Sequence, residues 1–165
     1  MTCKKIVKII FMDIDNTLVK SYFIDYYLAR PDLLMEKLAT AKPFPWIVNS
    51  TIFDDDAIVH FITGRFDHQE EVTRNWIECN IGITEFGLHV VGYTNYEDYV
   101  MDKARAFREV LLEVIEEFGN GIELHFYEDS EKVIEVSIGE KNKVCDIPME
   151  IHLVKGGELQ AGYMA

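Results

Sequence analysis

An α/β fold with a mainly parallel, doubly wound, three-layer sheet is the fold class that the sequence predicts. Apolar runs rich in β-branched residues alternate along the chain with segments that have helical spacing. Continuous apolar runs are typical of parallel strands buried on both faces. Their alternation with helices is typical of a doubly wound sheet. At 165 residues the chain has the length of one domain, so residues 1–165 are expected to form a single unit.

Four apolar runs are predicted to be strands, and a fifth follows near the C-terminus. They cover residues 6–12, 57–62, 88–93, 122–127 and 149–154. The first run leads into Asp13-Ile14-Asp15-Asn16-Thr17, where Asn16 indicates a turn. After the fifth run, Gly156-Gly157 predicts a turn and a short return; the role of residues 140–165 stays open.

Helices are predicted at three places where apolar residues recur at helical spacing: from Pro31 within residues 21–40, from Asp67 or His68 to about Gly82, and over residues 102–118. Gly119-Asn120-Gly121 is expected to end the last of them. Residues 43–46 contain two prolines and are expected to form a rigid loop. Asp54-Asp55-Asp56 fits a solvated turn before a strand better than a metal cluster.

Composition excludes several classes of protein. A formal net charge of −13 argues against a broad nucleic-acid-binding face, which usually needs basic residues. Cys3, Cys79 and Cys145 are widely spaced and fit reduced thiols, with neither a disulfide framework nor a zinc site. The first apolar run is too short to span a membrane and continues directly into the acidic segment. We therefore expect a cytoplasmic protein without a membrane partner.

Polar residues follow three of the predicted strands at their carboxyl ends. They are Asp13 and Asp15, Thr63 and Arg65, and Glu128 and Asp129, while Lys103 is expected at the start of a helix. In open α/β sheets, ligands bind at this edge. Four acids, one hydroxyl and one lysine suit phosphoryl transfer with Mg²⁺, which prefers carboxylate and phosphate oxygens. The alternative is that these are ordinary turn residues and a solvated lysine.

These residues resemble the motifs of the haloacid dehalogenase-like (HAD) superfamily of phosphohydrolases. Asp13-Ile14-Asp15-Asn16-Thr17 matches the first motif, Asp-x-Asp-x-Thr, and Thr63 matches the second. Lys103 matches the third motif and Glu128-Asp129 the fourth, although Asp-Asp is more usual there. The resemblance covers residues 6 to about 130 and implies a Rossmann-like core.

The resemblance also implies chemical roles. Asp13 would attack phosphorus and form an aspartyl-phosphate, which water then hydrolyses. Asp15 would protonate the leaving oxygen and later deprotonate that water, so it must be able to hold a proton. Thr63 would hydrogen-bond a phosphoryl oxygen, and Lys103 would tie that oxygen to Asp13. An aspartate at the position of Asp15 is typical of phosphatases and phosphotransferases in this superfamily.

The same resemblance implies a metal site and substrate contacts. Mg²⁺ would be held by Asp13, the backbone carbonyl of Asp15, Glu128 and Asp129. Thr17, Gly64 and Arg65 are expected to contact substrate, and Arg65 fits equally well as a salt-bridge partner. Because its side chain is one methylene longer than that of Asp, Glu128 would either reach Mg²⁺ through water or leave more of the coordination to Asp129.

The segments on either side of Thr63 are too short for a full cap domain. Residues 18–57 are therefore expected to form only a flap or minimal helical lid over an open site. An open site suits a macromolecule, or a small phosphorylated molecule if a second subunit of a homo-oligomer closes it. Thr63-Gly64-Arg65 with residues 72–77 is also similar to the phosphatase domain of polynucleotide kinase-phosphatases. This local likeness implies a nucleotide or nucleic-acid end as substrate.

Several aromatic residues near the site suit stacking on a base, with core packing as the alternative: Tyr22, Phe23, Tyr26, Tyr27, Phe44 and Trp46. Four histidines fall in strand-like runs without metal or nucleophile spacing, and are expected to be satisfied core or edge residues: His60, His89, His125 and His152. Two other functions remain open. One is a non-catalytic or regulatory binding domain, and the other is a phosphotransferase.

Overall fold

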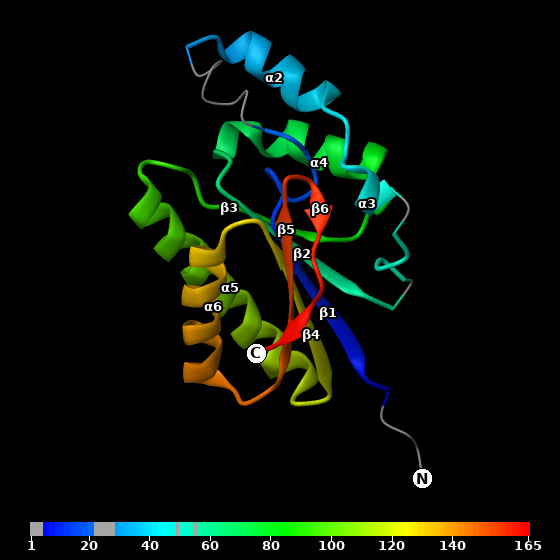
Figure 1. Ribbon diagram of the computed structural model, residues 1–165, viewed down its shortest axis with the longest axis vertical. Helices are drawn as coiled ribbons and strands as arrows, with labels where there is room; N and C mark the ends of the chain where they lie inside the picture. Colours follow the sequence, from blue (N-terminus) through cyan, green and yellow to red (C-terminus); the bar gives the residue numbers. More distant parts are fainter. Residues whose placement is uncertain (1–4, 22–28, 49, 55) are drawn as a thin grey trace.

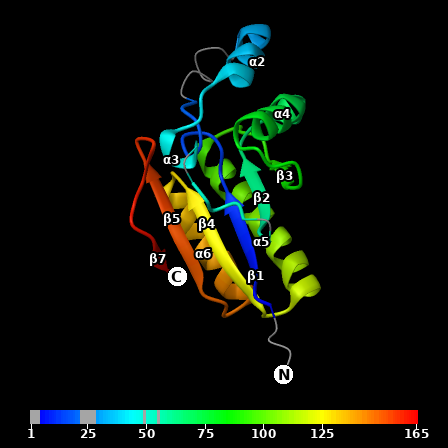
Figure 2. The ribbon, with the colours of Figure 1, turned by 90° about the vertical axis from the view of Figure 1, so that its right-hand side faces the viewer.

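The computed structural model describes residues 5–21, 29–48, 50–54 and 56–165. It is an α/β structure in which helices lie on both faces of a mixed, mostly parallel sheet (Figures 1 and 2). The predicted fold class is confirmed at this level.

Five parallel strands make up the main part of the sheet. They are β1 (Val7–Met12), β2 (Ile58–Thr63), β3 (Gly87–Val90), β4 (Ile122–Glu128) and β5 (Met149–Lys155). Their order is β3-β2-β1-β4-β5, and each neighbouring pair is parallel. Two short strands, β6 (Glu158–Leu159) and β7 (Tyr163–Met164), pair antiparallel with β5. All five predicted strands and the short return are confirmed.

The helices differ from prediction in three respects. The structure contains α2 (Pro31–Thr40), α3 (Pro45–Val48), a 3₁₀ turn η1 (Asp67–Gln69), α4 (Glu70–Asn80), α5 (Tyr96–Phe118) and α6 (Glu131–Val144). Helix α5 begins six residues earlier than expected, because the Asn95 side chain caps it by accepting a hydrogen bond from the backbone of Asp98. Helix α6 was not predicted. The expected rigid loop at 43–46 instead leads into α3 at Pro45.

Two hydrophobic cores lie on the two faces of the sheet. One packs α5 and α6 against one face and contains a cluster of three rings, Phe11, Phe107 and Phe126. The other lies beneath α4 and α3 and includes Trp76 and Tyr127. Because both faces are covered, the central strand β1 is completely buried from Ile9 to Met12.

The segment predicted to be a lid contains α2 and α3 in its described part. Helix α2 buries Leu34 and Leu38 and lies against α4 (Figure 1). The indole Nε1 of Trp76 on α4 donates a hydrogen bond to the carbonyl of Ala41, 2.6 Å away, just beyond α2. Residues 22–28 lie outside the described residues. So do four of the aromatic residues considered for base stacking: Tyr22, Phe23, Tyr26 and Tyr27.

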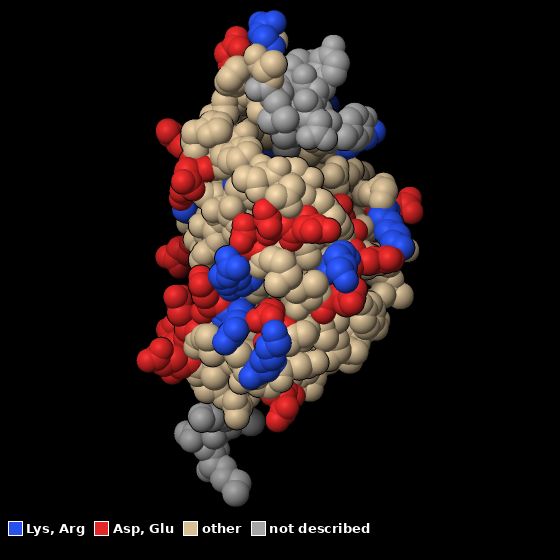
Figure 3. All heavy atoms as spheres, turned by 90° about the vertical axis from the view of Figure 1, so that its left-hand side faces the viewer, with Lys and Arg blue, Asp and Glu red and all other residues tan. Residues whose placement is uncertain are grey.

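The surface over α5 and α6 carries interspersed charges of both signs (Figure 3). Several of its basic side chains are already paired with acids, as in Arg108 with Glu140 and Lys132 with Glu135. This face therefore offers no uniform basic patch to nucleic acid. Among the described residues, Cys79 and Cys145 are free thiols, and no helix has both the length and the hydropathy needed to cross a membrane.

Phe107 is expected to be a main source of stability, because its ring contacts both Phe11 and Phe126 in the core. Phe107→Ala should lower the free energy of unfolding by about 3–5 kcal/mol, measured by urea denaturation. The matched control is Leu112→Ala on the exposed face of the same helix, which should change it by less than about 0.5 kcal/mol. Equal effects of the two substitutions would contradict this account of the core.

Candidate functional site

The candidate site lies at the carboxyl edge of the sheet, where the strand order reverses between β1 and β4. Asp13 directly follows β1, Thr63 ends β2, and Glu128 ends β4. In open α/β sheets this reversal leaves a crevice that binds ligands. The chain leaves β1 through a tight turn in which Asn16 has a left-handed backbone, with φ of 63°. Asparagine tolerates that conformation better than most residues, so the predicted turn is confirmed.

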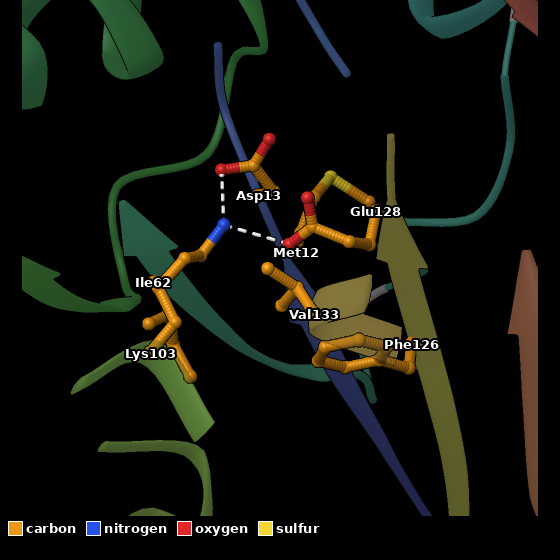
Figure 4. Close-up of a pocket in the computed structure, with 7 residues that line it drawn as sticks. All are labelled: Met12, Asp13, Ile62, Lys103, Phe126, Glu128 and Val133. Carbon is orange, nitrogen blue, oxygen red and sulfur yellow. Dashed lines mark hydrogen bonds and ion pairs between the residues drawn. The ribbon is translucent and has the colours of Figure 1, made fainter. Parts of the chain in front are cut away.

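Asp13 is held by contacts to both of its carboxylate oxygens. The hydroxyl of Thr17 donates a hydrogen bond to Oδ2 over 2.8 Å, and Lys103 Nζ lies 2.6 Å from Oδ1. The Lys103 amine also lies 2.7 Å from Oε2 of Glu128 (Figure 4). All three charged side chains are nearly inaccessible to solvent. One lysine therefore joins β1, β4 and α5.

Lys103 comes from the interior of α5 and not from its first turn, which corrects the prediction that it begins a helix. It follows Tyr99 by one turn, and its Nζ lies 5.3 Å from the centroid of that ring. Gly64 allows the ring to approach, because a Cβ at that position would lie 2.6 Å from Cε2 of Tyr99. Gly64 thus has a packing role, and its predicted contact with substrate stays a prediction.

Glu128 has partners for both carboxylate oxygens. Oε2 contacts Lys103, and Oε1 accepts hydrogen bonds from the backbone N–H groups of Asp129 and Ser130, at 3.1 and 3.2 Å. Carboxylate oxygens of Asp13, Glu128 and Asp129 all lie within 4.8 Å of one another. Three of the four predicted metal ligands therefore converge through their side chains.

The second aspartate of the motif faces a different group of residues. Arg65 Nη2 and Nε lie 2.7 and 3.0 Å from the two carboxylate oxygens of Asp15. The hydroxyl of Thr63 also points at Asp15, at 3.3 Å, and Arg65 Nη1 donates a hydrogen bond to Thr73. Arg65 is buried, so the structure gives it the salt-bridge role; its contact with a substrate phosphate stays a prediction.

Burial and mutual repulsion raise the pKa of two acids in the cluster. Loss of solvation raises the pKa of Asp13 to about 7, and the charge of Glu128 adds to this shift while Lys103 opposes it. Loss of solvation, with the charges of Asp13 and Glu128, raises the pKa of Asp129 to about 9. Burial disfavours the charged amine of Lys103, but Asp13 and Glu128 outweigh this and raise its pKa. The cluster has more negative charge than Lys103 can balance.

The pKa of Asp15 shifts the other way. Burial alone would raise it, but the charge and hydrogen bonds of Arg65 outweigh burial and lower it. The two pKa values are therefore pushed apart, because Lys103, which is paired with Asp13, is shared with Glu128, whereas Arg65 is paired with Asp15. With Mg²⁺ bound we expect Asp13 to be ionised and Asp15 to be able to hold a proton, and this assignment stays a prediction.

A divalent cation fits the cluster of Asp13, Glu128 and Asp129. The ligand atoms of the cluster are all carboxylate oxygens, the type that Mg²⁺ prefers. The cluster also carries excess negative charge, which such an ion would balance. The carboxylate of Asp15 is turned toward Arg65, so only its backbone carbonyl remains the expected ligand from that residue.

A cavity of about 550 Å³ opens beside the acidic cluster. Asp129 lines it, together with residues from the turn after β1, the start of α3 and the β5–β6 turn: Asn16, Lys20, Phe44, Val154, Lys155, Gly156 and Gly157. Phe44 alone among the described aromatic candidates lines this cavity. Trp46 instead stacks on Tyr127 and donates a hydrogen bond to the carbonyl of Thr17.

Sequence reasoning missed the contacts of two residues around the site and of two histidine pairs elsewhere on the sheet. Tyr99 was detectable as the residue one turn before Lys103, but only with the correct start of α5. Thr73 lies within the quoted residues 72–77, but nothing in the sequence indicates its hydrogen bond with Arg65. Two pairs of the histidines meet across strands: His60 with His89, and His125 with His152. Spacing along the chain could not reveal these pairs.

The pKa shifts predict how pH and metal affect stability. An acid whose pKa is raised by folding stabilises the folded state fully only below its unfolded pKa, and this contribution is lost as pH rises through the folded pKa. With chelator present, the melting temperature should therefore fall as pH rises from about 4 to 9, because Asp13 and Asp129 lose their protons in the folded state over this range. Mg²⁺ should raise the melting temperature at pH 8, because it binds only the folded cluster.

The control for this prediction is Asp129→Asn, which removes one of the two titrating groups. The melting temperature of this variant should fall less steeply with pH, and Mg²⁺ should stabilise it less. A melting temperature that is independent of both pH and Mg²⁺ in the wild-type chain would count against a cation-binding cluster.

No family model, curated protein or solved structure matches the chain.

Proposed function

We propose that this chain is a Mg²⁺-dependent phosphomonoester hydrolase that uses Asp13 as its nucleophile. The observation that carries the proposal is the position of the Asp13 carboxylate. It lies at the carboxyl end of the central strand, held by Thr17 and Lys103, and beside the acids of the fourth motif. A turn-forming aspartate with no chemical role would not require a buried lysine and a buried glutamate as neighbours.

In the first step an Asp13 oxygen would form a bond to phosphorus as the ester oxygen leaves. The contacts to Thr17 and Lys103 fix the direction of the carboxylate, so little conformational freedom is lost on reaching the transition state. Lys103 would also place positive charge near the phosphoryl oxygens. When bound by Asp13, Glu128 and Asp129, Mg²⁺ would add further positive charge and favour the ionised form of Asp13.

In the second step water would attack the phosphoryl group, restoring Asp13 and releasing inorganic phosphate. Asp15 would accept the proton of that water: Arg65 keeps its carboxylate ionised and so able to accept a proton, while the lowered pKa makes it a weaker base. In the first step Asp15 would give a proton to the leaving oxygen, so it would first have to take one up from solvent or keep the one accepted from water in the previous turnover. Movement of Arg65 away from Asp15 would raise its pKa and permit this.

The substrate proposed is a nucleotide or the phosphorylated end of a nucleic acid. The cavity beside Asp129 supports this choice, because its volume of about 550 Å³ suits a compact leaving group. Phe44 contributes an aromatic ring to the cavity lining, and Lys20 and Lys155 line it as well; Lys155 is ion-paired with Glu131, 2.6 Å away. An enzyme that contacts only a strand end would need no extended basic surface, in keeping with the net charge of −13.

The direct test is Mg²⁺-dependent phosphate release from a panel of substrates. The panel would contain p-nitrophenyl phosphate, nucleoside monophosphates, sugar phosphates and oligonucleotides phosphorylated at the 3′ or 5′ end. Asp13→Asn should lower turnover at least about a thousandfold, because it removes the nucleophile at nearly constant volume. The control Asp102→Asn, one residue before Lys103, should retain activity. Wild-type activity in Asp13→Asn would refute the mechanism.

Asp15→Asn should separate the two steps. With p-nitrophenyl phosphate, whose leaving group needs little protonation, we expect a burst of p-nitrophenolate followed by turnover about 10²–10⁴-fold slower than wild type. Rapid-mixing absorbance would measure both phases. Thr73→Val is the control, because it removes the other partner of Arg65 but leaves the Asp15 carboxylate in place. Undiminished steady-state turnover in Asp15→Asn would exclude its role as base.

The same assays separate the other two functions. A phosphotransferase would transfer the phosphoryl group to an added alcohol faster than to water. A binding domain would bind phosphorylated ligands without releasing phosphate from any of them. The presence together of Asp13, Asp15, Thr63 and Lys103 favours turnover, since binding alone has no chemical need for both aspartates.

A further inference from the structure

A second cluster of potential metal ligands lies on β4 and β5, apart from the acidic site. It consists of His125, Glu150 and His152. The distance from His125 Nδ1 to His152 Nε2 is 3.1 Å. Oε2 of Glu150 lies 3.5 Å from His125 Nδ1, and Oε1 of Glu150 lies 3.6 Å from His152 Nε2.

The sheet register explains why these three side chains meet. His125 pairs with Glu150 across the parallel strands, and Glu150 and His152 are two residues apart on β5. Side chains at these positions point to one face of the sheet. Glu128, three residues after His125, is on the opposite side of β4, so the two clusters lie on different faces.

The distances suit a tetrahedral metal ion. Ligands at the usual 2.0–2.2 Å from Zn²⁺ are separated from one another by about 3.3–3.6 Å in tetrahedral geometry. The two nitrogens lie 3.1 Å apart, and the 3.5 and 3.6 Å separations belong to different oxygens of Glu150; one ligand atom from each of the three residues lies within 4.8 Å of the others, a spacing that an ion could draw together. Two imidazoles and a carboxylate form a known set of ligands for zinc that leaves the fourth position open.

The neighbours of the cluster orient its rings. The Nε2–H of His125 donates a hydrogen bond to Glu123, which leaves the lone pair of Nδ1 directed toward His152 and Glu150. The ring of His152 stacks on Tyr127 with centroids 4.1 Å apart and planes inclined by 7°. A carboxylate behind a ligating histidine is the usual way in which metal sites fix that ring.

The cluster is also accessible from solvent. The side chain of Glu150 is 39% exposed, which gives an ion a route to the cluster. Gly162 lies next to Glu150 and His152, where a Cβ would approach the Glu150 carboxylate to 3.1 Å.

We propose that His125, Glu150 and His152 form a binding site for a divalent transition-metal ion of the Zn²⁺ type, independent of the proposed phosphatase site. The fourth ligand would be water. Nitrogen ligands favour Zn²⁺ or Co²⁺ over Mg²⁺, so the two clusters should select different ions. The site would link β4 to β5 and present a Lewis acid on the face of the sheet opposite Glu128.

The histidine pair on β2 and β3 provides a matched control. His60 Nδ1 lies 3.3 Å from His89 Nε2, so the ring-to-ring contact resembles that of His125 and His152. Among the described residues, no third histidine, cysteine or acid completes this pair to a metal-binding group. The proposal therefore assigns metal binding to one pair and a simple hydrogen bond to the other.

The test is titration of the full chain with Zn²⁺ by calorimetry, in millimolar Mg²⁺ to occupy the acidic cluster, and with Co²⁺ by visible absorption. We expect one equivalent of Zn²⁺ to bind and Co²⁺ to give a tetrahedral spectrum without thiolate bands. His152→Ala and the nearly isosteric Glu150→Gln should each weaken Zn²⁺ binding at least about tenfold, while His89→Ala should leave it unchanged. Circular dichroism would establish that each variant is folded.

Three results would overturn the proposal. The first is failure of the wild-type chain to bind Zn²⁺ or Co²⁺ in the presence of Mg²⁺. The second is binding that is equally strong in folded Glu150→Gln and in the wild type. The third is binding that is lost in Asp129→Asn but kept in His152→Ala, which would place the ion in the acidic cluster.

Discussion

The contact of Lys103 with both Asp13 and Glu128 joins the parts of the molecule on which the candidate site depends. Asp13 follows the central strand, Glu128 ends the neighbouring strand, and Lys103 comes from a long helix on one face of the sheet. None of these charged groups could be buried alone, since an unpaired buried charge costs several kcal/mol or more. The buried ion pairs of the site therefore depend on the same packing of strands and helix that forms the core.

Much of the fold could be predicted from the sequence, because parallel strands buried on both faces leave unmistakable apolar runs. The helices were harder to delimit. The first turn of α5 is exposed and holds Tyr96, Glu97 and Asp98, so the buried apolar stripe begins only at Val100. In α6, buried Ser137 and Lys141 interrupt the apolar pattern. Periodicity detects the buried face of a helix but not its solvated or polar turns.

The candidate site was predictable as a list of residues but not as a network. Strand ends located Asp13, Asp15, Thr63 and Glu128 at one edge. Which side chains at that edge contact one another depends on the three-dimensional structure and cannot be read from the spacing of residues along the chain. Arg65 pairs with Asp15, whereas Lys103 is shared by two acids, and this difference raises the pKa of Asp13 and lowers that of Asp15. The meeting of His125, Glu150 and His152 likewise depends on the register of β4 and β5.

Trp46 connects the surroundings of the two clusters. Its indole nitrogen donates a hydrogen bond to the backbone of Thr17, whose hydroxyl holds Asp13, and its ring stacks on Tyr127, which stacks on His152. The other tryptophan, Trp76, is buried beneath α2 and contacts neither cluster through these links. The chain therefore contains a built-in fluorophore that contacts a neighbour of each cluster, and we expect its emission to respond to ligand binding at either of them without an added label.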